Sequence, residues 1–258
     1  MTRMSHVIVV IPALNAAASL PDTFASLEPA IACGLVSRWV LADGGSGDAT
    51  VKLARARGFD VVKSLPGRGV QLAAGARKAL DSAGEGDWLF FLHADTRLEP
   101  GWAKAAKAFM ATHVGKDAAG YFRFALDDDS APARRLERFV AWRCAAFGLP
   151  YGDQGLLIPA RFYEAVGGYR LMRLFEDVEL ARRVGKRRLK PIRARAVTSA
   201  ARFREEGYLR RSAANLILLA RYFVGADPEK LARAYRPRRR PAAALVSDSP
   251  PDTKDETR

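Results

Sequence analysis

The sequence predicts an α/β fold in which helices pack on a mostly parallel β-sheet. Short apolar runs alternate with segments of helical apolar spacing throughout the first hundred residues. Each of these apolar runs ends in a polar or glycine-rich loop, and no repeat or linker-like segment divides residues 5–235. This alternation is typical of repeated βαβ units, so we expect one continuous domain built around a parallel sheet.

The elements of the first hundred residues follow from their apolar pattern. Short apolar runs predict strands at 7–11, 39–42, 61–63 and 88–92. Helical spacing and strong helix formers predict helices at 18–27, 50–57 and 71–82. The loops that follow three of the strands are 12–15, 43–48 and 93–96. They fall at the carboxyl ends of the strands, where open parallel sheets bind their ligands.

Beyond residue 101 the pattern is more mixed. It predicts helices at 102–113, 133–147 and around 162–166, and extended segments at 121–126 and 156–160. The acidic segment FEDVEL at 175–180 leads into a basic helix, and apolar residues recur at helical spacing over 209–223 with arginines on other faces. The last segment, 241–258, carries Pro, Ser and mixed charge without periodicity, which predicts a disordered tail.

Composition excludes several classes of protein. The chain has 258 residues, of which 49% are hydrophobic and 27% charged, as in soluble globular proteins rather than disordered, collagenous or disulfide-scaffold chains. Cys33 and Cys144 form no CxxC or Cys/His cluster, so we expect two buried thiols and no structural zinc site. No apolar stretch approaches the ~18 residues of a membrane span, and the short N-terminal run lacks a signal-peptide pattern, so we expect a cytoplasmic protein.

The positive charge of the chain is concentrated in one region. The net charge is +14, from 42 basic and 28 acidic residues. Residues 182–240 hold 19 basic against four acidic side chains, whereas the first hundred residues are neutral. This region is open to three interpretations: a solvated face, a polyanion site, or a surface at 202–240 that docks on anionic lipid headgroups at the cytoplasmic face of a membrane. Nucleic acid is disfavoured, because the aromatic residues there follow helical spacing and no known binding module is present.

The loop in LADGGSGDAT is the first candidate site. Asp43 ends a predicted strand and is followed by a glycine-rich turn that exposes backbone N–H groups, so its carboxylate is placed to accept hydrogen bonds from a ligand. The alternative is structural, since DG turns are common and Asp48 fits a helix N-cap. The segment lacks the spacing of GxGxxG and the lysine of GxxxxGK[ST], which disfavours NAD and P-loop nucleotides.

The segment LFFLHADTRLEPGW holds the second candidate site. An apolar run delivers His93 and Asp95 to the end of a presumed central strand, and strand alternation would put both on one side. Carboxylate oxygens suit Mg²⁺ or Mn²⁺ that is also held by substrate phosphates. The alternative is a core histidine with a loop aspartate.

A third acidic site is the pair Glu176 and Asp177, at a predicted helix start. Carboxylates in a first helical turn are favoured by the helix dipole alone, which is a sufficient structural explanation. The functional alternative is a general base that takes a proton from an attacking hydroxyl.

Taken in order, these segments resemble a known family. VIVVIPALN, LADGGSGDAT, FLHADT, and GGY followed by FEDVELARR are similar to the family 2 inverting glycosyltransferases over about residues 5–200. GRGVQLAAGA, HADTRLEPGW, YGDQGLLIP, VTSAARF and FVGADPEKLARAYR further resemble a bacterial branch named for its association with radical-SAM and selenium-related genes. The ordered set carries the resemblance, since no single motif is specific.

The resemblance implies a GT-A fold with C-terminal amphipathic helices. Its parts would be a nucleotide-sugar-binding half at 5–100, an acceptor and catalytic half at 101–200, and a basic helical extension at 201–235. The implied activity is inverting transfer of a sugar, of the hexosyltransferase type, from a nucleotide-diphosphate sugar to a hydroxyl acceptor such as a lipid-linked one. The implied cofactor is Mg²⁺ or Mn²⁺.

The resemblance also implies roles for individual residues. Asp177 would be the catalytic base beside Glu176, and Asp95 would hold the metal, in a DxD position where His93 replaces the first aspartate. The donor side would be formed by Pro12, Ala13, Leu14, Asn15, Asp43, Arg68, Gln71 and Ala94. The acceptor side would be formed by Gly152, Asp153 and Gln154.

Two other function classes remain open from the sequence. A basic module that binds membrane or polyanion without catalysis would explain residues 202–240 alone. A nucleotidyltransferase would also use a metal-binding aspartate, but it needs a triphosphate loop rich in Gly, Arg and Lys, and residues 12–20 carry no charge.

Overall fold

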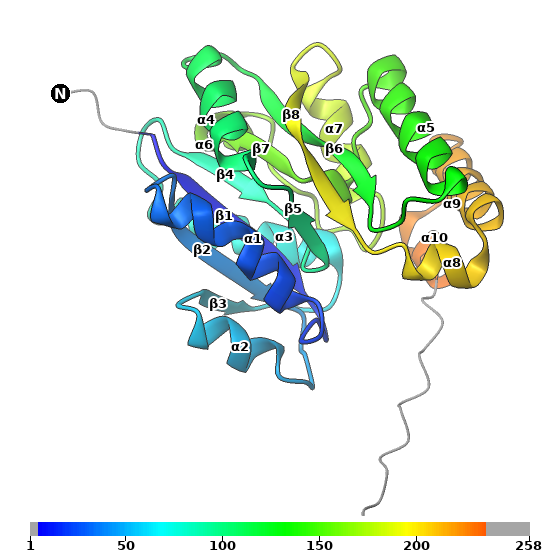
Figure 1. Ribbon diagram of the computed structural model, residues 1–258, viewed down its shortest axis with the longest axis horizontal. Helices are drawn as coiled ribbons and strands as arrows, with labels where there is room; N and C mark the ends of the chain where they lie inside the picture. The colour runs from blue at the N-terminus through cyan, green and yellow to red at the C-terminus, as the bar shows by residue number, and fades with distance from the viewer. Residues whose placement is uncertain (1–4, 236–258) are drawn as a thin grey trace, which may run out of the picture.

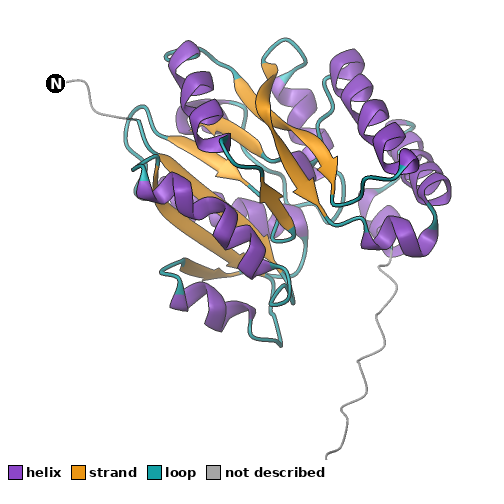
Figure 2. Cartoon of the chain, in the orientation of Figure 1, coloured by secondary structure: helices purple, strands orange, loops and turns teal. Residues whose placement is uncertain are grey.

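The computed structural model describes residues 5–235, so the predicted tail at 241–258 and the basic run RPRRR at 236–240 lie outside the described residues. The elements surround one eight-stranded sheet with the order β3-β2-β1-β4-β7-β6-β8-β5 (Figures 1 and 2). The fold is therefore α/β with a large central sheet, as the apolar pattern predicts.

The parallel half of the sheet is built from the first hundred residues. Strand β1 pairs in parallel with β2 and β4, and β2 pairs in parallel with β3. The sequence therefore predicts the elements of this half in the right order, but β2 and α3 each begin three residues earlier than expected and α1 ends five residues later. The elements are β1 (Val7–Ala13), α1 (Leu20–Ala32), β2 (Val36–Asp43), α2 (Thr50–Ala56), β3 (Asp60–Lys63), α3 (Arg68–Leu80) and β4 (Trp88–Phe91).

The second half of the sheet is mixed. Strand β7 is antiparallel to both β4 and β6, β8 is parallel to β6, and β5 is antiparallel to β8. The elements are β5 (Thr96–Leu98), α4 (Trp102–Thr112), β6 (Ala119–Leu126), α5 (Ala131–Phe147), the 3₁₀ helix η1 (Gly152–Gln154), β7 (Leu156–Pro159), α6 (Ala160–Ala165), α7 (Glu176–Val184), β8 (Leu189–Thr198), α8 (Ala201–Glu206), α9 (Tyr208–Phe223) and α10 (Pro228–Ala234).

Helices cover both faces of the sheet. Side chains of β1 that alternate along the strand enter two different cores: Val9 packs in the core shared with α1 and α4, and Val10 packs in the core shared with α3 and α6. Figure 1 shows α1 and α4 on the near face and α3 on the far face. A strand buried on both faces reads as a continuous apolar run, which is why β1 and β4 are recognisable in the sequence.

The C-terminal helices lie at one end of the molecule, where α9 contacts α5 (Figure 1). Arg173, in the loop before α7, reaches α10 through an ion pair with Glu229 (Nε to Oε2, 3.4 Å). Within residues 5–235, no helix combines the length and apolar character needed to cross a membrane.

One expectation about the cysteines is wrong. Cys144 is buried, as expected, but Cys33 is exposed. Cys33 follows the last residue of α1 and lies in the turn that leads to β2, where the chain runs over the surface.

Candidate functional site

The loops after β1 and β2 form one connected rim at the edge of the sheet. Ala13 and Asp43 are paired across the two strands. The Asn15 amide donates to Ser46 Oγ (2.9 Å), and the Gly47 amide donates back to Asn15 Oδ1 (2.9 Å). Pro12 and Ala13 are buried, whereas Leu14 and Asn15 are exposed. The backbone of this rim is therefore held in place by its own side chains.

Asp43 shapes the loop that follows it. Its buried carboxylate accepts hydrogen bonds from the amides of Gly45 and Ser46, both at 3.2 Å. An aspartate that accepts from the next backbone amides forms an Asx turn. The DGGSG segment therefore has a defined backbone with one carboxylate at its base.

Gln71 faces the backbone of the sheet. Its buried side-chain amide donates to the carbonyls of Ala13 (2.6 Å) and Ala42 (3.1 Å), at the ends of β1 and β2. The family resemblance implies that Gln71 contacts the donor. The two hydrogen bonds that its side-chain amide donates go to the backbone of the rim, so Gln71 would affect donor binding by fixing the rim.

Arg68 is brought to the acidic pair by a close approach between the first turn of α3 and the loop before α7. The Gly69 amide donates to the Met172 carbonyl (3.0 Å), and a Cβ atom at Gly69 would lie 2.5 Å from the Arg170 carbonyl oxygen. Only glycine permits this contact. Arg68, the first residue of α3, thereby lies beside Glu176, with 3.7 Å between Nε and Oε1. Arg68 is 43% exposed and Glu176 is 1% exposed.

Glu176 is a buried carboxyl group with few polar contacts. Neither of its oxygens has a hydrogen-bond partner within residues 5–235. Burial raises the pKa of Glu176 to about 7, because the charged form loses its hydration; Arg68 acts in the opposite direction, and Asp177 adds to the increase. Glu176 therefore exchanges its proton near neutral pH, next to the charge of Arg68.

The raised pKa of Glu176 predicts how the free energy of unfolding depends on pH. The pKa of Glu176 is raised in the folded state from 4.5 to about 7, so the unfolded chain releases the proton first, and the free energy of unfolding falls as pH rises between these values. Glu176→Gln should remove this loss and be more stable than wild type at pH 8 by on the order of 2 to 4 kcal/mol. Urea unfolding at pH 5 and pH 8 measures the difference.

The matched control is Glu164→Gln, at an exposed position of α6. It should unfold like wild type at both pH values. An equal pH dependence in wild type and Glu176→Gln would show that Glu176 is not the group that titrates.

The segment after β4 separates His93 from Asp95. Strand β4 ends at Phe91, so the alternation expected to put both residues on one side does not extend to them. His93 Nε2 is buried and has no partner in the described chain, and a Cβ atom at Gly152 would lie 2.3 Å from it. Burial first, and then Arg68, lower the pKa of His93 well below 6.5, so its ring is neutral. His93 therefore packs on Gly152.

Asp95 is placed differently. Its side chain is exposed and makes no hydrogen bond within residues 5–235. The preceding residue, Ala94, is buried, and its carbonyl accepts a hydrogen bond from Thr23 Oγ1 (3.0 Å). A fixed backbone thus presents a free carboxylate to solvent. No three His, Cys, Asp or Glu side chains gather into a metal-binding group in the described part of the chain.

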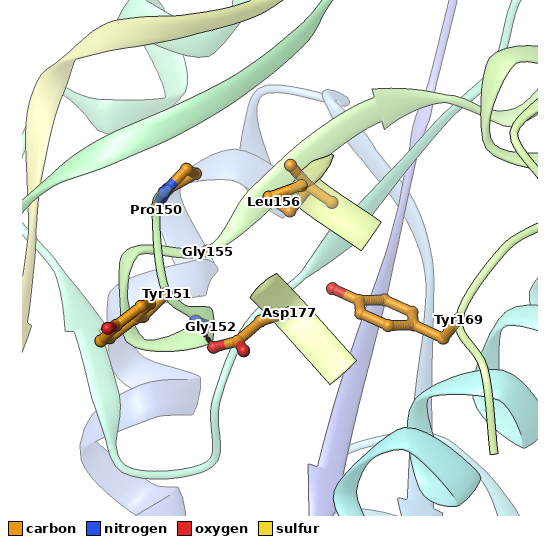
Figure 3. Close-up of a pocket in the computed structure, with 8 residues that line it drawn as sticks. Pro150, Tyr151, Gly152, Gly155, Leu156, Tyr169 and Asp177 are labelled. Atoms are coloured by element: carbon orange, nitrogen blue, oxygen red, sulfur yellow. Dashed lines mark hydrogen bonds between the residues drawn. The ribbon is translucent and has the colours of Figure 1, made fainter. Parts of the chain in front are cut away.

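Asp177 lies in a hollow lined by aromatic and small residues. Its Oδ2 accepts a hydrogen bond from the Gly152 amide (2.8 Å), and its Oδ1 accepts one from the Val178 amide (2.7 Å). Figure 3 shows Asp177 between Tyr151 and Tyr169. The hollow is lined by Pro150, Tyr151, Gly152, Gly155, Leu156, Tyr169, Asp177 and Ala181. The carboxylate is therefore oriented by two backbone amides at the wall of a small hollow.

The GDQ turn contains two polar side chains with different surroundings, of which Gln154 is buried and Asp153 is half-buried. Gln154 donates to the Phe122 carbonyl (3.0 Å) and accepts from the Tyr151 amide (3.2 Å), so its side chain connects the turn to β6. Asp153 Oδ1 has no partner within residues 5–235. Burial raises the pKa of Asp153 to about 6; Arg143 opposes this shift, and Asp177 adds to it. Gln154 is therefore hydrogen-bonded within the protein, whereas one buried oxygen of Asp153 has no partner in the described chain.

The structure brings several distant segments of the chain together. Asp95 and Asp177 both lie close enough to Arg68 to raise its pKa, and close enough to Asp153 to raise its pKa as well. Sequence reasoning misses Arg143, Tyr151 and Tyr169, which surround the two aspartates. Tyr169 follows the Gly167-Gly168 turn and Tyr151 precedes GDQ, so adjacency to a recognised motif is the only signal that could have indicated them.

Comparison with known proteins gives one family match. A family model described as glycosyl transferase family 2 matches residues 8–177. No curated protein matches the chain.

Solved structures of glucosyl-3-phosphoglycerate synthase from Mycobacterium tuberculosis are similar in fold. The complex with UDP has 20% sequence identity and a TM-score of 0.51, over 73% of this chain and 70% of that chain. The complex with Mn²⁺, UDP and glucosyl-3-phosphoglycerate has 19% identity and a TM-score of 0.50, over 76% and 70%. At this level of identity the likeness concerns the fold, which is of the GT-A type.

Proposed function

The chain belongs to glycosyl transferase family 2, and from this premise we propose that it is an inverting hexosyltransferase of the bacterial radical-SAM and selenium-associated branch. It would move a sugar from a nucleotide-diphosphate sugar to a hydroxyl acceptor. The observation that carries the proposal is the placement of Asp177, whose carboxylate is aimed by the Gly152 and Val178 amides into a hollow. Arg68 and the free carboxylate of Asp95 lie in the same cluster of charges.

The donor would lie along the rim of the parallel half. The backbone from Pro12 to Asn15 would contact the nucleotide base, and Asp43 would contact the base or ribose. Hydrogen bonds between the Asn15 and Ser46 loops support this role, because they fix the groups that a ligand would meet. Arg68 would contact the diphosphate, since it is a partly exposed guanidinium. Ala94 would contribute through its fixed backbone.

The residues present fit a divalent cation that is shared with the donor. The described chain has no group of three metal-ligating side chains, but Mg²⁺ is commonly held by one or two carboxylates together with substrate phosphates and water. The exposed, hydrogen-bond-free carboxylate of Asp95 suits that arrangement. When bound, Mg²⁺ or Mn²⁺ would neutralise charge on the leaving diphosphate. The related synthase from Mycobacterium tuberculosis binds Mn²⁺ with UDP, which supports this assignment.

Asp177 would act as the general base. Inversion requires the acceptor oxygen to attack the anomeric carbon from the face opposite the leaving diphosphate, so no covalent sugar–carboxylate intermediate is needed. The acceptor O–H proton passes to Asp177, the new C–O bond forms, and the bond to the nucleotide diphosphate breaks. Glu176 would affect this proton transfer through its ion pair with Arg68, because its own carboxyl group is buried.

The acceptor side would be formed by the GDQ turn. The Gly152 amide donates to Asp177, one oxygen of Asp153 has no hydrogen-bond partner in the described chain, and Gln154 fixes the turn by donating to the Phe122 carbonyl. We further propose that the acceptor is lipid-linked and that residues 202–240 contact an anionic membrane surface at the cytoplasmic face, with 236–240 outside the described residues. The exposed apolar and arginine side chains of α9 support this proposal.

A screen of nucleotide sugars tests the proposed function. At least one UDP-, GDP- or dTDP-sugar should raise the melting temperature by about 5 °C or more at saturation, and only with Mg²⁺ or Mn²⁺ present. A non-catalytic module that binds membrane or polyanion predicts vesicle or RNA binding that is indifferent to metal, and no nucleotide effect. A response to nucleoside triphosphates in place of nucleotide sugars would indicate a nucleotidyltransferase.

A further inference from the structure

A groove separates α5 from α9. The open space in it, counted together with the solvent at its mouth, is about 470 Å³. Its apolar lining comes from β6, α5, α8 and α9, namely Phe124, Leu136, Phe139, Val140, Phe203 and Leu216. Ser212 and Asn215 add two small polar groups on the α9 side. A lining of this kind favours an alkyl chain over a sugar, because apolar surface gains free energy when it is removed from water.

The inner end of the groove is polar and adjoins the hollow of Asp177. Arg143, Tyr151 and Asp153 line this end. The Arg143 guanidinium lies 3.4 Å from the centre of the Tyr151 ring and donates to the Leu149 carbonyl (3.1 Å). Tyr151 also lines the hollow of Asp177. Tyr151 is therefore shared by the groove and the hollow, so this end of the groove lies beside the proposed catalytic site.

The outer end of the groove opens onto an exposed apolar surface. Phe139 and Leu216, which line the groove, are 36% and 41% exposed. They continue into a stripe of exposed residues at helical spacing on α9 and its C-terminal end, which we call the α9 stripe: Leu209, Ala213, Leu216, Ile217, Ala220 and Val224. Trp142 and Phe147 are also exposed, on α5. Soluble proteins rarely leave so many large apolar side chains together in water.

The charges around this surface match an anionic bilayer. On α9, Arg210 and Arg221 are exposed beside the α9 stripe, and on α5, Arg135 and Arg138 are exposed. These four arginines make no ion pair within residues 5–235. An apolar helix face flanked by arginines is typical of helices that lie in the plane of a membrane interface.

We propose that the groove between α5 and α9 binds the hydrocarbon chain of a lipid acceptor drawn from an anionic bilayer. The acceptor hydroxyl would lie at the inner end, by Asp153 and Tyr151, and face Asp177. The α9 stripe would rest on the bilayer and place the open end of the groove at the lipid surface. This inference rests on the proposed sugar transfer, because the hydroxyl is the group that would be glycosylated.

Photolabelling of the full chain tests the groove. The probe is a sixteen-carbon primary alcohol with a diazirine in its chain, carried in phosphatidylglycerol vesicles, and the labelled residues are located by mass spectrometry. Label should appear on the groove-facing residues of α5 and α9. Ser212→Trp, which fills the groove, should lower the labelling of α5 at least tenfold. Phosphatidylcholine vesicles should give at least tenfold less label.

Ala214→Trp is the matched control, because it adds the same side chain at an exposed position of α9 outside the groove lining. It should label like wild type. Equal labelling of α5 in Ser212→Trp and wild type, or label confined to the α9 stripe, would overturn the proposal. Asn215→Phe fills the same groove and replaces Ser212→Trp if the latter fails to show a cooperative melt.

The nucleotide-dependent melting shift, measured on the same proteins, separates the two proposals. A retained shift without groove labelling would overturn the groove alone. Groove labelling without any nucleotide shift would overturn the proposed sugar transfer.

Discussion

Asp177→Asn is expected to lower sugar transfer by on the order of 10²- to 10⁴-fold while nucleotide-sugar binding is kept. The factor is the usual contribution of a general base, and the physical reason is that a neutral amide cannot take the acceptor proton. Asparagine keeps one oxygen that can accept the Gly152 amide hydrogen, so the GDQ turn should stay in place. The measurement is transfer rate together with the nucleotide-dependent melting shift.

The control is Asp81→Asn, an exposed position just beyond the last residue of α3, at the opposite end of that helix from Arg68. It should leave both quantities unchanged. Transfer by Asp177→Asn within threefold of wild type would exclude Asp177 as the base.

Asp95→Ala is expected to remove the metal-dependent part of the nucleotide-induced melting shift and to lower transfer at least about a hundredfold. The reason is that Asp95 is the exposed carboxylate proposed to share a cation with the donor diphosphate, and such a cation contributes several kcal/mol of charge stabilisation. Because the side chain makes no hydrogen bond in the described chain, its loss should leave the metal-free melting temperature unchanged. Thermal melts with and without Mn²⁺ and the nucleotide sugar provide the measurement.

Asp22→Ala, at an exposed position of α1, serves as the matched aspartate control. It should respond to metal and nucleotide like wild type. A full metal-dependent shift in Asp95→Ala would mean that the cation, if used, is held elsewhere.

The parallel half of the fold could be predicted because burial on both faces leaves a simple pattern. Strands β1 and β4 are continuous apolar runs, and the helices between them keep helical spacing. Strand β8 could not be predicted in this way. It carries exposed Lys190, Arg193 and Arg195 between buried Ile192, Ala194 and Ala196, and Pro191 interrupts the alternation. Long basic side chains on the open face mask a strand whose buried face has only two large apolar side chains, Leu189 and Ile192, beside alanines.

The candidate site could be predicted only where it is local in sequence. Asp43 ends β2, Asp95 directly precedes β5, and Asp177 lies in the first turn of α7, so residue type and position were enough to indicate them. The pairing of Arg68 with Glu176 depends on an approach between Gly69 and Met172 across more than a hundred residues. Gln71 donates to carbonyls at the ends of β1 and β2, and Gln154 donates to the Phe122 carbonyl within β6. Only the folded chain determines which carbonyls these side chains meet.

Gln71 has a further consequence for how a donor would bind. Its buried amide holds the ends of β1 and β2 together before any ligand arrives. The conformational entropy of these loops is therefore lost when the chain folds, and little remains to be lost on binding. Affinity for the nucleotide would thus depend in part on hydrogen bonds that Gln71 makes to the protein's own backbone.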